Sequence, residues 1–154
     1  MNILKGSTIL KISTFIFLLL FAGSCFAAEY ASIKNDGVNI RSGPSTKDEV
    51  LWEVFKDYPV EILKRKGDWV QVRDFENDKG WVYASLLSSH KTMIVKVETA
   101  NMRSGPGKEN KVIASVKKGV VFTPIDQKGN WIKVKYKNDI TGWMFNTLVF
   151  PDTY

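Results

Sequence analysis

The sequence has very few of the residues that catalytic and metal sites use. It contains one cysteine, Cys25, and one histidine, His90, among 154 residues. A cysteine–histidine couple and a histidine-based metal site are therefore not expected, and no disulfide can form within the chain. A phosphate-binding glycine loop, a nucleophile elbow and zinc-ligand spacing are also missing. We predict a protein that is not an enzyme, with no catalytic residues, no metal and no cofactor.

Long apolar runs are lacking after the first 27 residues. Near the start, two lysines precede an apolar stretch over residues 12–22, and small residues lead to Ala27. This order predicts a signal peptide over residues 1–27. The apolar stretch is shorter than the about 20 residues that span a bilayer, but an uncleaved anchor is one alternative, and acylation of Cys25 is another. We expect an exported protein, periplasmic or extracellular, that contacts the membrane only if Cys25 is lipidated.

The chain aligns with itself without a gap, so that Arg41 matches Arg103 at an offset of 62 residues. The match is carried by residues 38–44 with 100–106, residues 66–72 with 128–134, and residues 80–83 with 142–145. A repeat this long is a small domain present twice. We place the first domain at residues 29–88 and the second at residues 91–151. The short polar connection between them should restrict their relative motion.

Short segments of alternating apolar and polar residues follow one another in both copies. In the clearest one, residues 69–73, Val70 and Val72 share one face and Trp69 lies on the other. Such segments, separated by turn residues, predict short strands in small barrels or sandwiches. No segment has a helical stripe, although residues 84–87 could form one helical turn. We therefore predict an all-β fold.

The tryptophans are the most informative side chains for a binding site. Trp69 and Trp131 are expected on the outer face of their strands, where an indole can serve as a flat ligand platform or can fold over and close the end of the barrel. Trp81 and Trp143 are out of phase with their core-facing neighbours. They could border the same groove, although a structural role is the stronger interpretation for this pair.

The repeated motifs together resemble a known family. Both copies contain Asn-x-Arg-Ser-Gly-Pro, then Lys-Gly-Asp/Asn-Trp, and finally Gly-Trp, over residues 37–87 and 99–149. In this order they resemble the bacterial SH3-like (SH3b) domain. The resemblance implies two small SH3-like β-barrels in tandem, each with five or six strands. It also implies non-catalytic domains that bind peptidoglycan peptides or protein partners.

The resemblance also implies where a ligand would bind, in a groove between the first long loop and the turn before the Trp strand. The residues that this places at the groove are Trp69, Tyr58 and Tyr83 in the first copy, and Trp131, Val120 and Phe145 in the second. The second copy thus lacks two phenolic hydroxyls, so the two copies are expected to bind different ligands.

The shared Arg-Ser-Gly-Pro motif has a physical interpretation of its own. Arg41 and Arg103 can either tie down the following loop or hold a ligand carboxylate as a fork. Gly43 and Gly105 are expected to adopt positive φ where the strand turns into that loop.

The two copies differ in charge. Residues 29–90 have a net charge of −2 and residues 91–154 a net charge of +6. The basic half favours an anionic partner such as a wall polymer, a lipid head group or an acidic peptide, and a solvated lysine surface without a partner is the equal alternative. Nucleic acid is not expected, since an exported protein rarely meets it. We therefore predict an exported module that recognises peptidoglycan or another cell-wall peptide or glycan. The alternative is an adaptor that docks an exported enzyme or a membrane sensor.

Overall fold

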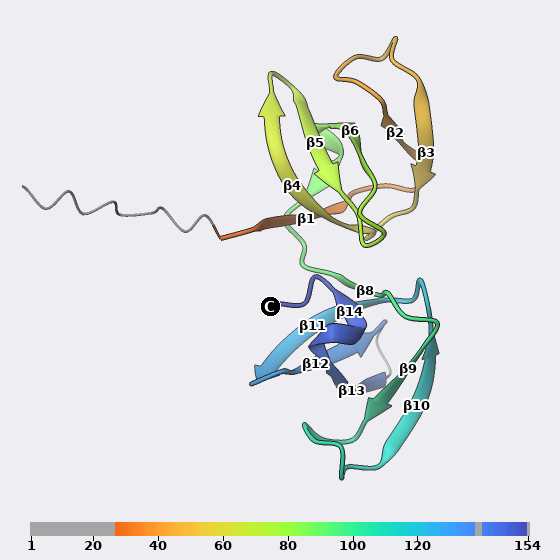
Figure 1. The fold of residues 1–154 in the computed structure, drawn as a ribbon, viewed down its shortest axis with the longest axis vertical. Helices are drawn as coiled ribbons and strands as arrows, with labels where there is room; N and C mark the ends of the chain where they lie inside the picture. Colours follow the sequence, from red (N-terminus) through yellow and green to blue (C-terminus); the bar gives the residue numbers. More distant parts are fainter. Residues whose placement is uncertain (1–26, 138–139, 154) are drawn as a thin grey trace, which may run out of the picture.

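Each copy of the repeat forms its own antiparallel seven-stranded sheet (Figure 1). The structure is a computed structural model that describes residues 27–137 and 140–153. Residues 1–26 of the predicted signal peptide, with Cys25, lie outside the described residues. No helix among the described residues is long and apolar enough to cross a membrane.

The first unit contains seven strands and one short 3₁₀ turn. They are β1 (Glu29–Ile33), β2 (Val38–Arg41), β3 (Val50–Val54), β4 (Pro59–Lys66), β5 (Trp69–Arg73), β6 (Lys79–Tyr83), η1 (Ala84–Leu86) and β7 (Leu87–Ser88). The strand order in the sheet is β3-β2-β6-β5-β4-β1-β7. The predicted helical turn at residues 84–87 is thus the 3₁₀ turn η1.

The second unit repeats this arrangement. Its elements are β8 (Met93–Val95), β9 (Thr99–Arg103), β10 (Val112–Lys117), β11 (Val121–Lys128), β12 (Trp131–Tyr136), β13 (Ile140–Phe145), η2 (Asn146–Leu148) and β14 (Val149–Phe150). The order β10-β9-β13-β12-β11-β8-β14 is the same order as in the first unit. The prediction of an all-β protein with two small units in tandem is confirmed.

The strand count is seven in each unit, where five or six were expected. The additional strands are the two-residue segments β7 and β14, which follow the 3₁₀ turns and pair with β1 and β8. They form because each 3₁₀ turn reverses the chain and returns it to the first strand of its own unit. Each sheet is thereby extended by one short strand.

Alternation along the strands separates the core from the outer face as expected. Val70 and Val72 are fully buried in the first core, and Ile132 and Val134 are fully buried in the second. Burying these branched side chains is the main source of stability in units this small.

Glycine in the Gly-Trp motif allows two strands to approach closely. A Cβ added at Gly80 would lie 2.3 Å from Cγ2 of Ile40, and one at Gly142 would lie 2.4 Å from Cγ of Met102. Real Cβ contacts are essentially never this short, so a larger residue at Gly80 or Gly142 would force the packing around Ile40 or Met102 to shift. The motif is therefore explained by packing.

The prediction of positive φ at Gly43 and Gly105 is wrong. Positive φ at glycine occurs at other positions among the described residues: Gly37, Gly67, Gly119 and Gly129. Gly43 instead lies under the carboxylate of Asp48, which a Cβ would meet at 2.5 Å. At Gly105 the amide of Asn110 takes the same place. A larger residue at either position would therefore require the Asp48 or Asn110 side chain to move aside.

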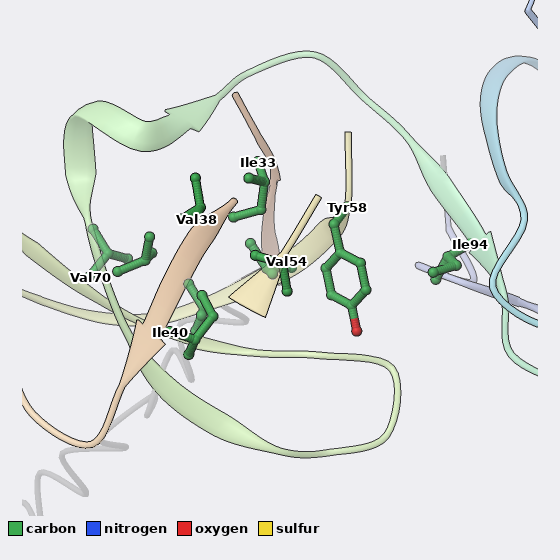
Figure 2. Close-up of a cluster of buried hydrophobic side chains, with 10 residues drawn as sticks. Ile33, Val38, Ile40, Val54, Tyr58, Val70 and Ile94 are labelled. Atoms are coloured by element: carbon green, nitrogen blue, oxygen red, sulfur yellow. The ribbon is translucent and has the colours of Figure 1, made fainter. Parts of the chain in front are cut away.

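The two units contact each other directly. Ile94 of β8 belongs to the core cluster of the first unit, and Figure 2 shows it beside Tyr58. The hydroxyl of Thr92 donates to the carbonyl of Asp57 at 2.7 Å, and the hydroxyl of Ser32 donates to the carbonyl of His90 at 2.7 Å. These bonds and the shared core fix one unit against the other.

Candidate functional site

An aromatic pair on the outer face of the first unit forms the centre of the candidate site. Trp69 and Tyr83 lie opposite each other on β5 and β6. Their ring centroids are 5.5 Å apart and the rings are almost perpendicular, at 84°. This is the edge-to-face geometry that aromatic pairs prefer. Trp69 is half-buried and Tyr83 is 39% exposed, so both rings present area to solvent.

A hydrogen bond holds the exposed ring of Tyr83 in place. Its hydroxyl donates to Oδ2 of Asp68, in the turn before β5, at 3.2 Å. This bond to a carboxylate raises the pKa of Tyr83 above its ordinary value. The hydroxyl therefore stays protonated at neutral pH.

A shallow groove of about 310 Å³ lies beside this aromatic pair. Its lining combines the two rings with the loop before β2, β2 itself, one residue of the loop after β2, and the 3₁₀ turn. The lining residues are Asn35, Asp36, Gly37, Val38, Asn39, Arg41, Thr46, Trp69, Tyr83 and Leu86. The groove thus offers flat apolar faces beside amide and carboxylate groups, a mixture that suits a neutral or mildly polar ligand.

Both motif arginines bind their own loops. Nη1 of Arg41 donates to the carbonyl of Asp48 at 2.9 Å. Nη1 of Arg103 donates to the carbonyls of Lys108 and Asn110, both at 2.8 Å. These side chains could either tie down the following loop or hold a ligand carboxylate, and the structure shows that they tie down the loop. Arg41 also lines the groove.

Tyr58 does not lie at the groove, contrary to the prediction. It is 8% exposed and packs in the first core against the rings of Phe55 and Phe75. Its hydroxyl donates to Oδ2 of the buried Asp74 at 3.2 Å. Asp57, with φ of 66°, precedes it and turns the chain so that the ring enters the core.

Trp81 and Trp143 are likewise not part of an open groove. They are 8% and 7% exposed, and neither is among the residues that line the groove. The ammonium of Lys64 lies 5.4 Å from the ring centroid of Trp81, and that of Lys128 lies 5.8 Å from Trp143. Lysine stems and neighbouring strands therefore cover these indoles, and their role is structural.

The second unit keeps the aromatic pair but loses its polar groups. Trp131 and Phe145 are opposite on β12 and β13, with ring centroids 5.3 Å apart at 74°. Phe145 replaces Tyr83, and Asn130 replaces the carboxylate that bound its hydroxyl. The hydroxyl and its acceptor changed together, which supports the expectation that the two copies differ in what they bind.

Several of the lining residues that sequence reasoning missed lie in the loop before β2. Asn35 and Asp36 line the groove, and Oδ1 of Asp36 accepts the backbone N–H of Lys56 at 2.8 Å. The Asn-Asp-Gly sequence is a turn signal that marks a loop, but it does not indicate which strand the loop will lie beside. At the aligned positions the second unit has Val97 and Glu98.

No group of three or more His, Cys, Asp or Glu side chains that could hold a metal is found in residues 27–137 and 140–153. The candidate site consists of a rigid aromatic pair, hydrogen-bonding loop residues and a shallow open groove.

The fold and the groove define a pair of small SH3-like β-barrels. Residues 34–89 and residues 98–149 each match a family model described as bacterial SH3 domain. The chain belongs to this family, with two such domains in tandem.

Two curated relatives carry similar segments. YrvJ of Bacillus subtilis (strain 168), a putative N-acetylmuramoyl-L-alanine amidase, is 34% identical over 140 residues, which cover 84% of this chain and 27% of that protein. LytH of Staphylococcus epidermidis, a probable cell wall amidase, is 32% identical over 76 residues, covering 46% of this chain and 26% of that protein. The chain thus spans about a quarter of the length of these relatives.

The solved structures that the chain resembles have lower sequence identity. An NlpC/P60 family protein from Bacillus cereus ATCC 10987 has 13% identity and a TM-score of 0.36, covering 79% of this chain and 55% of that chain. NlpC2 from Trichomonas vaginalis has 18% identity and a TM-score of 0.34, covering 80% of this chain and 48% of that chain. Likenesses this weak carry no functional argument.

Proposed function

We propose that the protein is a non-catalytic, exported binding module that holds a cell-wall peptide or glycan in the groove beside Trp69 and Tyr83. The observation that carries this proposal is the aromatic pair itself. Two large rings are partly exposed, fixed by each other and by Asp68, and bordered by amide side chains. Rigid aromatic rings give contact area at a low cost in conformational entropy.

The chemistry of wall material fits this groove. Sugars and short peptides present apolar C–H surfaces that pack on an indole, together with hydroxyl and amide groups that need hydrogen-bond partners. Asn35 and Asn39 supply donors and acceptors beside the rings. The bacterial SH3 family match and the two relatives named as amidases, one of them as a cell wall amidase, support a role at the wall.

A second candidate function is the adaptor that docks an exported protein. It is favoured by apolar side chains that stay exposed at matching positions of the two edge strands. Val50 and Leu51 are exposed on β3, and Val112 and Ile113 are exposed at the aligned positions on β10. Crosslinking that captures one saturable protein partner, with no retention on wall material, would favour this function over the first.

The test is retention of the mature protein on purified insoluble sacculi. Trp69→Ala should weaken binding by about 2 kcal/mol, roughly 30-fold, because truncating an aromatic hot spot costs this much. Trp131→Ala is the matched control, since it truncates the equivalent indole in the groove that lacks the hydroxyl and the carboxylate. Loss of retention in the first variant alone supports the proposal. Equal retention of wild type and Trp69→Ala rejects it.

A further inference from the structure

A second groove lies between the two copies and shares no lining residue with the aromatic groove. Its volume is about 450 Å³. The first unit contributes Phe55, Lys56 and Asp57, and the second unit contributes Thr92, the segment 119–123 and the segment 135–137. We call this groove the inter-unit cleft. It exists only because the two units are held together, so neither copy could form it alone.

The inter-unit cleft is basic. Lys56, Lys135 and Lys137 line it, and Asp57 is the single carboxylate among its lining residues. Within the described residues none of the three lysines forms an ion pair. The ammonium of Lys137 lies 5.3 Å from the ring centroid of Tyr136, which also lines the cleft. The described lining residues of the cleft therefore carry more positive than negative charge.

Comparison of the aligned residues of the two units shows which positions give the cleft its positive charge. In the first unit, Arg73 is paired with Glu61 across β5 and β4. At the aligned positions of the second unit, Lys135 lies opposite Thr123, so the carboxylate partner is gone.

Three further differences between aligned positions also contribute to the more positive charge of the second unit. Asp57 corresponds to Gly119, Asp74 to Tyr136, and Phe75 to Lys137. Over these five aligned positions the charge changes from −2 to +2, and all five residues of the second unit line the cleft. The halves differ by eight charges, from −2 to +6, and four of these therefore come from positions whose second-unit residues line the cleft.

Contacts on both sides hold the cleft in shape. The bond from Thr92 to the carbonyl of Asp57 crosses it. Nearby, the ammonium of Lys118 contacts Oε1 of Glu76 at 2.7 Å and lies 5.6 Å from the ring centroid of Phe75. A binding surface that is already ordered loses little entropy when a ligand binds.

We infer that the inter-unit cleft is a second binding site, which takes a soluble chain of phosphate groups. The lining contains lysines and no arginine. Lysine binds phosphate as a point charge, without the fixed two-pronged geometry that arginine gives to carboxylate and phosphate alike. Several separate ammonium groups along an open cleft match a ligand whose charges repeat. This inference does not depend on the proposed role of the aromatic groove.

The test uses inorganic tripolyphosphate as the probe, titrated calorimetrically into the mature two-unit protein at low salt. The cleft variant is Lys135→Gln/Lys137→Gln, and the matched control is Lys108→Gln/Lys111→Gln. Lys108 and Lys111 are exposed residues of the same unit outside the cleft, so both variants have the same net charge. The cleft variant should lose about tenfold or more in affinity, and the control about threefold or less.

A third variant adds charge of the opposite sign. Thr123→Glu recreates the carboxylate that the first unit has at Glu61, and it should weaken tripolyphosphate binding as the double variant does. Trp69→Ala should leave this binding unchanged, which separates failure of the cleft from failure of the aromatic groove. Equal losses in the cleft and control variants, no binding by wild type, or tighter binding of a polyglutamate of matched charge would each overturn the inference.

Discussion

Tyr58→Phe is the substitution that best tests how the first core is built. The change removes only the hydroxyl that donates to Oδ2 of Asp74. Oδ1 of Asp74 still accepts the backbone N–H groups of Glu76 and Asp78, at 2.9 and 3.0 Å. Oδ2 would be left buried without a partner. Because an unsatisfied buried acceptor costs about 1–3 kcal/mol, we expect a loss of about 2 kcal/mol in the free energy of unfolding.

The assay is urea unfolding followed by tryptophan fluorescence, and Tyr83→Phe is the matched control. Both substitutions delete a tyrosine–aspartate hydrogen bond of 3.2 Å, but Tyr58 is buried and Tyr83 is exposed. Tyr83→Phe should change stability much less, because water replaces the lost partner. Equal effects of the two substitutions would refute the claim that burial gives the Tyr58 bond its importance.

The same pair gives a prediction about pH. Burial raises the pKa of Asp74 above its ordinary value of 3.8, since desolvation disfavours the carboxylate. The folded protein therefore binds this proton more tightly than the unfolded chain, and its contribution to stability is full below pH 3.8 and is lost as pH rises through the raised pKa. As pH rises from below 3.8 to above the raised pKa, the free energy of unfolding of wild type should fall relative to that of Asp74→Asn. If it rises instead, the pKa of Asp74 is not raised in the folded protein.

Two further substitutions test packing and the loop. Gly142→Ala should cost about 1–3 kcal/mol, since the new Cβ would overpack Met102, and the melting temperature measures this. Arg103→Ala should lower the melting temperature by removing two hydrogen bonds to loop carbonyls, at about 1 kcal/mol each. An unchanged melting temperature would mean that this arginine does not hold the loop.

Local pattern was enough to predict the strands, because the face on which a side chain lies follows directly from the period of two. Val70 and Val72 are buried, and Trp69 is on the outer face, for this reason alone. The pattern could not predict Tyr58, because the left-handed turn at Asp57 resets the direction of the chain before β4 begins.

The sequence pattern also could not predict which side chains on the outer face would be buried. Trp81 lies on the same face as Trp69 but is covered by Lys64, which comes from another strand. Contacts between the units are a further case, since Ile94 enters the core of the first unit from the second. Such contacts depend on how the units pack, which a repeat pattern within one unit does not specify.

The most direct test of the central claim is the NMR spectrum of the five tryptophan indole N–H groups during titration with soluble peptidoglycan fragments. The account predicts that the signal of Trp69 shifts in a saturable way, while the signals of the buried Trp81 and Trp143 stay in place. Fragment binding that leaves Trp69 unmoved would contradict the claim that its groove holds wall material, as would saturating fragments with no change at any of the five signals.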